Sequence, residues 1–566
     1  MKNRRAFSHH TRWEWLPWVF VVQVVLLVIA GARNLATLNP DGIAYMRIAS
    51  YYAVGKADLA VTGYWGPLLS WLMVPLRWMG ISEIVCARSV MGFSAVVFLL
   101  GCVRLFRAFK LPCIALTYGA WICALFSVFA SVRNITPDLL MAGLTGLAIA
   151  PMVNGLWLSR IRWAAASGGF WALGYLAKAV AFPWAILVSI TYALIWFCLG
   201  RANGLLVGRG LGMAGLVFLL IGGSWMGVLS TKYGKFTFST TGPIAHAIAG
   251  PPDMPRYHPT FTTIHIPERG RLTSWEEPSE MPYRFWKPWE SRDYMMHQAT
   301  VMMGNSGVFL RWTTGVDLTA LRRIGKDDGA AILLRFIPGF DLFALCLLGM
   351  GCCFWIDSDR RRRLFRERWR WAVFPVIGLA LLYLPFYVGE TDRRYFYPVY
   401  PFFWIACSGF WSWLISRRFE RSGVRFKRAL IRIIIVSFGV PSLIWCAAAV
   451  HGIPNPAVAV AKAVATELRI RGLNGAVGGS GLWPGGRTGL YVAYYLDEPW
   501  LGDESENQVG MWSRSEARVI IVPAGQKENA SANPAHGSFN ILSPTDDQPQ
   551  WRAFANRYTI LVRRSF

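Results

Sequence analysis

The sequence predicts an α-helical polytopic membrane protein with a small α/β domain outside the membrane. More than half of its 566 residues, 54%, are hydrophobic. Only 16% are charged, whereas soluble domains carry about 25% charged residues. Long apolar runs recur along the chain, and most arginines stand in the short connections between them. The net charge of +26 therefore reports membrane topology and does not indicate a nucleic-acid partner.

Runs long enough to cross a membrane as helices of roughly 17–25 residues number about eleven. The first follows Lys2, Arg4 and Arg5, but it exceeds the usual signal-peptide core of about 7–15 residues, so we interpret it as a retained anchor. The predicted spans lie near 15–36, 84–103, 112–131, 138–157, 163–180, 182–200, 208–230, 335–356, 371–388, 398–416 and 429–450.

Orientation follows from the basic residues, which gather on cytoplasmic loops. Counting from a cytoplasmic N-terminus, the strongly basic short connections fall inside: 104–110, 160–162, 201–209, 360–370 and 417–428. Outside lie 37–82, 231–334 and the chain after 451. We therefore predict a transmembrane domain over 1–450 in the cytoplasmic (inner) membrane, with outer loops 37–82 and 231–334, and a periplasmic or extracellular domain over 451–566.

Two polar regions on the outer side have their own patterns. The loop 231–334 mixes prolines and aromatic residues with charges, which predicts a folded lid or substrate loop and not a disordered linker. After residue 455, a helix-like VAVAKAVATELRIRG precedes the strand-like GAVGGSG, ARVIIVP, FNILS and YTILVRR. This alternation predicts the small α/β domain. The ten cysteines avoid both polar regions, so the pattern indicates neither a disulfide framework nor a zinc site.

Two acids follow the same local pattern on the outer side. NPD ends at Asp41 and NITPD ends at Asp138, each with a capping-type residue, a proline and an acid at a predicted helix start. Both could simply complement the helix dipole. Capping does not explain why both fall on the outer side. An ionised carboxylate on that side can act as a general base, orient sugar hydroxyls or bind a divalent cation. The sequence indicates no other metal site and no cofactor.

Basic residues that could partner these acids also lie near outer helix ends. Lys178 interrupts an apolar run, where it faces a polar cavity or snorkels to the interface. Arg88 near the start of the second span binds substrate or anchors a lipid headgroup. Arg393 and Arg394 oppose the positive-inside rule; a bound phosphate would explain them, and pairing with the nearby acids 390 and 392 is the alternative.

These residues and their motifs resemble the GT-C glycosyltransferases. The resemblance rests on Asp41 after the first span, GYWGPLLSWLMVPL, Arg88, TPDLLMAGLTGLA with Asp138, YLAKAVAF with Lys178 and RRYFYPVYPFFW with Arg394. It is closest to the bacterial branch with lipid A aminoarabinose transferases and relatives of protein O-mannosyltransferases, and it covers roughly residues 10–416. The chain departs from that branch at Asp41-Gly42, where the mannosyltransferases have Asp-Glu, and at Trp65-Gly66, where the aminoarabinose transferases have a lysine.

The resemblance implies an inverting transfer of a sugar from a polyprenyl-phosphate donor to a lipid, glycan or protein acceptor at the outer membrane face. Asp41 would activate the acceptor hydroxyl, and Asp138 would position the sugar or a metal. Lys178 and Arg394 would hold the lipid phosphate. The remaining substrate-binding residues would be Arg88, Arg393, Tyr395, Tyr64 and Trp65. A flippase or transporter of lipid-linked sugars and an outer-face glycan polymerase or ligase are the alternatives.

Overall fold

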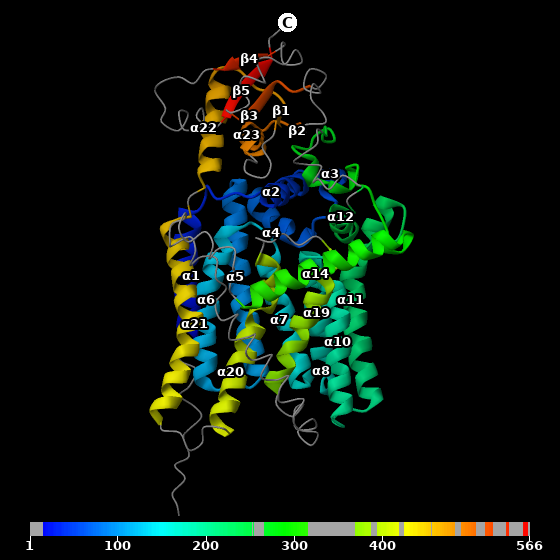
Figure 1. The fold of residues 1–566 in the computed structure, drawn as a ribbon, viewed down its shortest axis with the longest axis vertical. Coiled ribbons are helices and arrows are strands. Elements are labelled where there is room, and N and C mark those ends of the chain that lie inside the picture. Colours follow the sequence, from blue (N-terminus) through cyan, green and yellow to red (C-terminus); the bar gives the residue numbers. More distant parts are fainter. Residues whose placement is uncertain are drawn as a thin grey trace, which may run out of the picture.

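A computed structural model shows how these segments are arranged (Figure 1). It describes residues 15–251, 253, 265–314, 368–386, 393–417, 424–453, 455–480, 488–504, 516–523, 539–542 and 558–563. Long helices run side by side along the long axis and form a bundle, above which smaller helices and a sheet are stacked. The protein therefore has a helical layer, an intermediate layer and a mixed α/β layer.

The bundle helices begin and end close to the predicted spans. They are α1 (Leu16–Arg33), α5 (Glu83–Ala108), α6 (Cys113–Arg133), α7 (Asp138–Asn154), α9 (Ile161–Ala177), α10 (Ala181–Cys198), α11 (Gly204–Tyr233), α19 (Val373–Tyr383), α20 (Tyr400–Arg417) and α21 (Val424–His451). Short α8 (Leu156–Ser159) and η5 (Arg368–Ala372) connect or extend them. The predicted span 335–356 lies outside the described residues.

Several of these helices have the dimensions of membrane spans. Within the described part of the chain, six stretches are long and apolar enough to cross a bilayer: Leu16–Arg33, Glu83–Ala108, Cys113–Arg133, Ala181–Cys198, Gly204–Tyr233 and Phe438–Ile470. The class of a multi-pass helical membrane protein is thereby confirmed, whereas the number of about eleven spans stays a prediction.

Small residues let neighbouring bundle helices approach closely. A Cβ added at Gly101 of α5 would lie 2.4 Å from the carbonyl oxygen of Gly143 on α7. A Cβ at Gly168 of α9 would lie 2.1 Å from the carbonyl oxygen of Ala214 on α11. Backbone contact of this kind is how membrane helices associate without a hydrophobic driving force. It places α7 in the middle of the bundle, with nearly all of its residues buried.

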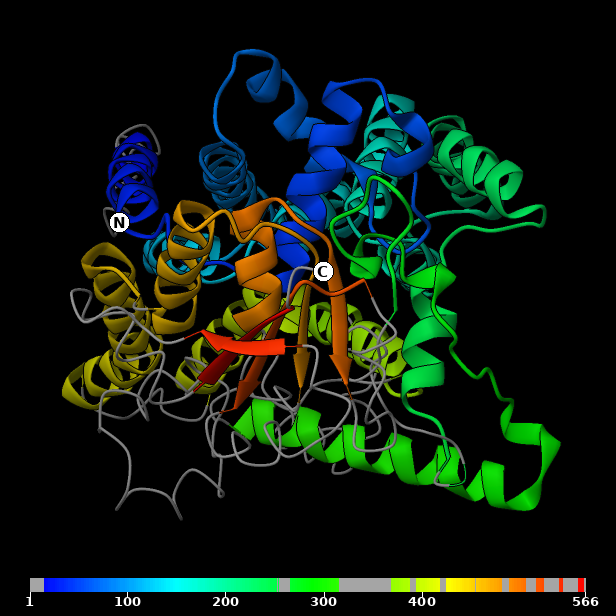
Figure 2. The ribbon, with the colours of Figure 1, turned by 90° about the horizontal axis from the view of Figure 1, so that it is seen from above.

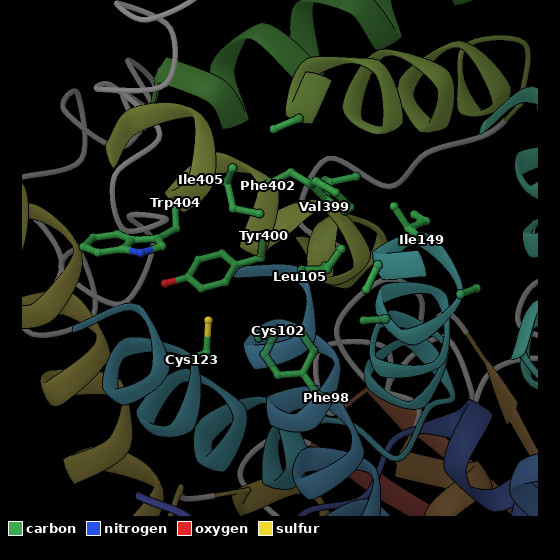
Figure 3. Close-up of a cluster of buried hydrophobic side chains, with 14 of the residues drawn as sticks. Phe98, Cys102, Leu105, Cys123, Ile149, Val399, Tyr400, Phe402, Trp404 and Ile405 are labelled. Carbon is green, nitrogen blue, oxygen red and sulfur yellow. The ribbon is translucent and has the colours of Figure 1, made fainter. Parts of the chain in front are cut away.

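Aromatic packing fixes α20 against α5 and α6 (Figure 3). The Tyr400 ring stacks on Phe126 with centroids 4.2 Å apart, and Trp404 Nε1 donates to the Ala115 carbonyl at 2.9 Å. Figure 3 shows Tyr400 beside Cys102 and Cys123 in this core. Because η6 (Arg393–Val399) leads directly into α20, the same packing positions η6.

The two loops that were predicted to be outside lie at the upper end of the bundle, and the longest helix of the second loop runs along one side of the bundle (Figures 1 and 2). The loop 37–82 contains α2 (Pro40–Ala53), α3 (Ala57–Ala60) and α4 (Pro67–Trp78). The loop 231–334 contains α12 (Thr241–Ile248), η2 (Ser274–Glu276), η3 (Pro278–Glu280), η4 (Pro288–Glu290) and the long α14 (Arg292–Thr314). Asn305 of α14 donates to the carbonyls of Leu384 and Phe386, beyond the end of α19. The described residues of the second loop thus contain helices, one of which is bound to the bundle, whereas the role of a lid or substrate loop stays a prediction.

The C-terminal region forms a five-stranded sheet of order β2-β1-β3-β5-β4. β1 is parallel to β2 and β3, and β5 is antiparallel to β3 and β4. The predicted helix and strands are α22 (Pro456–Ile470), β1 (Val477–Ser480), β3 (Val519–Pro523), β4 (Phe539–Leu542) and β5 (Tyr558–Arg563), whereas α23 (Thr488–Leu496) and β2 (Trp500–Glu504) were not predicted. Seen from above, the sheet lies over the centre of the helices (Figure 2).

This region is packed directly onto the intermediate layer. The Tyr491 hydroxyl donates to the Leu38 carbonyl at 3.2 Å, and the Tyr494 hydroxyl donates to Glu83 at 3.1 Å. Arg47 of α2 pairs with Asp497 at 2.9 Å. Apolar residues of α22 and α23 belong to the same buried cluster as residues of α2 and α4. The core is therefore continuous across the predicted boundary at residue 451.

Candidate functional site

The two acid motifs lie side by side where the bundle meets the intermediate layer. α2 begins at Pro40 and α7 at Asp138, as the sequence predicted to within one residue. Asn39 stands at the N-cap position, but its side chain makes no hydrogen bond to its own helix. Its Oδ1 instead accepts from the Ile135 backbone N–H at 2.9 Å. Asn39 therefore ties one acid motif to the other.

Gly42 explains one departure from the resembling family. A Cβ at Gly42 would lie 2.9 Å from both Asn39 Oδ1 and Ile135 Cβ, inside ordinary contact distance. A glutamate beside Asp41, as in the mannosyltransferase pattern, would have to displace the second motif. Glycine at this position is thus required by the close approach of α2 to the segment before α7.

Each acid pairs with one of the predicted cations. Asp41 Oδ2 lies 2.5 Å from Arg394 Nη1, and Asp138 Oδ1 lies 2.5 Å from Lys178 Nζ. The side chains of Asp41 and Arg394 are 16% and 15% exposed, whereas Asp138 is 1% exposed and Lys178 is 19% exposed. A substrate can therefore reach Asp41, Arg394 and Lys178, whereas the Asp138 carboxylate is covered.

Tyr395 joins the two ion pairs. Lys178 Nζ lies 4.4 Å from the centre of its ring, and Arg394 Cζ lies 5.6 Å from the same centre. Both distances permit cation–π attraction. Both cations therefore border the same ring, and each is paired with its own carboxylate.

Lys178 occupies the turn between two bundle helices. α9 ends at Ala177 and α10 begins at Ala181, and Lys178 itself has an extended backbone with φ −152° and ψ 125°. A Cβ at Gly66 would lie 2.3 Å from the Ala177 carbonyl oxygen, so the Trp65-Gly66-Pro67 turn packs against this helix end. The lysine is therefore held at a helix end by its surroundings and by Asp138, which argues against simple snorkelling.

Aromatic side chains form a wall beside Asp41. The Trp65 ring lies 4.7 Å from Tyr64, 5.1 Å from Tyr45 and 5.2 Å from Trp275, each edge to face. Burial raises the pKa of Tyr45 and of Tyr64 well above the usual value, and the negative charge of Asp41 adds to both shifts. Both phenols therefore stay neutral and can donate hydrogen bonds at physiological pH.

Trp275 is a site residue that the sequence did not single out. Its Nε1–H donates to Asp41 Oδ1 at 3.2 Å, and its carbonyl accepts from Trp65 Nε1 at 2.8 Å. The only signal in the sequence was the aromatic richness of the 231–334 loop, which predicted a substrate loop without naming a residue.

Arg88 is buried, with 6% of its surface exposed. It donates to the carbonyls of Ser131 and Val132 at the end of α6 and to the Thr37 carbonyl ahead of α2. These contacts connect Arg88 to the two acid-bearing segments, and its role as a substrate ligand stays a prediction. The Arg393 side chain, and the acids 390 and 392 considered as partners, lie outside the described residues.

The residues present do not build a metal site. Among the residues that the structure describes, no group of three or more histidine, cysteine, aspartate or glutamate side chains could hold an ion. Asp41 and Asp138 each have a cation as nearest partner, at 2.5 Å. A divalent cation bound to either carboxylate would have to displace the cation that pairs with it.

No protein-family model and no curated protein matches the sequence. Solved structures do match the fold. ArnT from Cupriavidus metallidurans bound to undecaprenyl phosphate aligns with 97% of this chain and 98% of its own, with a TM-score of 0.54 and 13% identity. The same protein in its apo state aligns with 97% of both chains, with a TM-score of 0.54 and 14% identity.

The archaeal oligosaccharyltransferase AglB from Archaeoglobus fulgidus aligns with 91% of this chain and 70% of its own, with 12% identity. Its TM-score of 0.42 is too low to carry an argument. The similarity to ArnT extends over nearly the whole chain, C-terminal region included. The chain thus has the GT-C fold, as the sequence motifs predicted.

Proposed function

We propose that this protein, as a chain with the GT-C fold, is a glycosyltransferase that moves a sugar from a polyprenyl-phosphate donor to an acceptor. The observation that carries the proposal is the meeting of two acid–cation pairs at Tyr395, where an accessible carboxylate stands beside two accessible cations. The ArnT structure of the same fold was determined with undecaprenyl phosphate, which supports a lipid phosphate as the anion.

Asp41 is the general base of the proposed reaction. It takes the proton from the acceptor hydroxyl while the hydroxyl oxygen attacks the anomeric carbon. The bond from that carbon to the phosphate oxygen breaks, and its electron pair stays on the lipid phosphate. Attack from the side opposite the phosphate inverts the configuration at the anomeric carbon. A positioned base typically contributes about 10²–10⁴-fold to the rate.

Arg394 and Lys178 stabilise the leaving phosphate. A guanidinium presents five N–H donors, so Arg394 can contact Asp41 and phosphate oxygens together. Lys178 contributes a compact charge from the turn after α9. Fixed cations aimed at charge that develops as the bond breaks lower the barrier without reorganisation. Asp138 holds the lysine in place. Tyr64 is partly exposed and offers a ring on which a sugar packs, and the buried Trp65 supports Tyr64 edge to face.

The proposed donor fits an outer-face site. The distribution of basic residues supports an orientation in which the N-terminus and the loop 360–370 are cytoplasmic and 451–566 is outside. A reporter active only outside the cytoplasm should be active when fused after His451 and inactive within 360–370. The reverse pattern would place the site in the cytoplasm and remove the case for a lipid-phosphate donor.

The function is tested directly with membranes that contain the protein. Polyprenyl-phosphate sugars, each labelled in the sugar, are supplied singly, and transfer of label to lipid, glycan or protein is followed. We expect one donor to be consumed with release of polyprenyl phosphate, and the labelled product identifies both the sugar, pentose or hexose, and the acceptor. Movement of intact donor across vesicle membranes without transfer would instead establish a transporter.

A further inference from the structure

The C-terminal sheet is connected to the proposed base by a short segment of the 231–334 loop. β2 is an edge strand, and the loop adds to that edge. The Trp500 N–H donates to the Leu272 carbonyl at 2.7 Å, and the His265 N–H donates to the Leu501 carbonyl at 2.8 Å. Thr273 and Trp500 form a parallel bridge. The loop is thereby anchored to the sheet by main-chain hydrogen bonds, in the manner of an added strand.

Directly after this anchor the loop makes a capped turn, η2. The Thr273 hydroxyl accepts from the Trp275 N–H at 3.2 Å. Glu276 Oε1 accepts from the N–H groups of Leu272 and Thr273 at 3.0 and 3.1 Å. Glu276 is 0% exposed, so water does not compete for these bonds. The turn therefore fixes the direction in which the Trp275 side chain leaves the backbone.

Trp275 is held on both sides and ends at Asp41. The ring is 5% exposed and packs edge to face against Trp65, whose Nε1 donates to the Trp275 carbonyl. The indole Nε1–H then donates to Asp41 Oδ1, while Arg394 pairs with Oδ2. An indole N–H only donates, so this contact favours the ionised carboxylate.

We propose that Trp275 is a positioning residue for Asp41, and that the C-terminal sheet acts on the reaction by holding the segment that carries Trp275. The inference rests on the proposed function of Asp41 as base. With Oδ1 held by Trp275 and Oδ2 by Arg394, the carboxylate plane is fixed and the acceptor proton has one defined approach. This gives the C-terminal region a role in catalysis through the segment that it holds.

The other groups around Asp41 do not titrate in the range of the test. Arg394 stays charged, and burial keeps Tyr45 and Tyr64 neutral by raising the pKa of each. The neighbouring pair of Asp138 and Lys178 is unchanged by a substitution at Trp275. Glu276, next to Trp275 in η2, is a further carboxyl group whose pKa is raised by burial, so the acid limb reports Asp41 where Glu276→Gln leaves that limb in place.

Trp275→Phe removes the N–H and keeps an aromatic ring. Because a hydrogen bond to the ionised form lowers the pKa of a carboxylate, its loss raises that pKa. We expect the acid limb of kcat to move to higher pH by about one unit, with kcat about tenfold lower at a pH on that limb and KM for the donor unchanged. Trp286→Phe is the matched control, since it removes an indole hydrogen bond to the His246 carbonyl in the same loop.

Glu276 tests the link to the sheet. Glu276→Ala removes the acceptor that shapes η2 and should reproduce the pH shift of Trp275→Phe. Glu276→Gln keeps an oxygen acceptor and should restore the wild-type profile. Thermal unfolding of each variant identifies any that fails to fold. A Trp275→Phe enzyme with an unchanged pH profile overturns the inference. Wild-type protein that consumes no polyprenyl-phosphate sugar overturns the proposed function instead, so the two failures are distinct.

Discussion

Asp41 and Asp138 end nearly identical sequence motifs, yet the structure gives their carboxylates opposite environments. α7 starts at Asp138 in the middle of the bundle, between α5 and α9, and the acid is 1% exposed. α2 lies across the top of the bundle, and Asp41 is 16% exposed beside the aromatic wall. The motif specifies a helix start with an acid, whereas the packing of the helix that follows decides whether that acid meets substrate or supports a neighbouring cation.

The largest difference should appear in Asp41→Asn. Loss of the base should reduce transfer by about 10²–10⁴-fold, because asparagine cannot accept the acceptor proton. The free energy of unfolding should change by only about 1 kcal/mol, since the acid is partly exposed and the amide oxygen can still accept hydrogen bonds.

Transfer assays and thermal unfolding measured together check this prediction. Asp58→Asn is the control, because Asp58 is an exposed first-turn acid of α3. An Asp41→Asn protein that is less stable yet transfers sugar at the normal rate would show that Asp41 only stabilises the start of α2 through the helix dipole.

Asp138→Asn should lower both activity and stability. Without the Asp138 carboxylate, Lys178 is no longer held in place. Transfer should then fall by roughly 10–100-fold, because a hydrogen bond to a charged group is worth about 1.5–3 kcal/mol. The free energy of unfolding should fall by up to about 3 kcal/mol. This is the low end of the cost of breaking a buried ion pair, because the lysine is partly exposed. If this variant instead matched Asp41→Asn in activity with unchanged stability, Asp138 would be a second reacting acid, and the contrast between the motifs would fail.

The cations of the two pairs should behave as one unit despite their different partners. Arg394→Ala and Lys178→Ala should each raise KM for the lipid donor by roughly tenfold, and the double variant should raise it by less than the product, since both contact one phosphate. Arg394→Lys should also be impaired, because an ammonium lacks the bidentate fork.

Donor-dependence curves for the singles and the double decide this point. Arg471→Ala is the control, since Arg471 pairs with Glu467 at 2.7 Å on α22, away from the site. Strictly multiplicative effects, or a normal donor KM in Arg394→Ala, would show that the two cations do not share a ligand.

The smallest effect should come from the contact between the motifs. Asn39→Ala removes the acceptor of the Ile135 N–H and should lower the free energy of unfolding by about 1–2 kcal/mol, with a several-fold loss of transfer as the acids become less well aligned. Thr136→Ala, at the matching position directly before Pro137 of the second motif, is the comparison. Denaturant unfolding measures the free energy of unfolding of both variants, and we expect a larger decrease for Asn39→Ala. Equal, negligible decreases would mean that the link through Asn39 does not contribute to stability.

Much of this protein was predictable because it depends on local or repetitive signals. Apolar runs of bilayer length predicted α5, α6, α10 and α11 closely, since every backbone polar group in lipid must be satisfied within its own helix. Proline after a polar residue predicted the starts of α2 and α7. β2 and α23 were missed because their stretches are short and lack a clear period, so that pairing within the sheet had to specify them.

The sequence by itself determined the membrane class, the helix starts that present both acids, and the set of cations at helix ends. Tertiary structure alone decided the pairing. Arg394 is 353 residues from Asp41 and Trp275 is 234 residues away, so no periodicity or cap signal relates them. Burial likewise depends on which helices surround a residue, as the contrast between Asp41 and Asp138 shows. Contacts across such distances in the chain form only when the helices pack, and that packing leaves Asp41 partly exposed and covers Asp138.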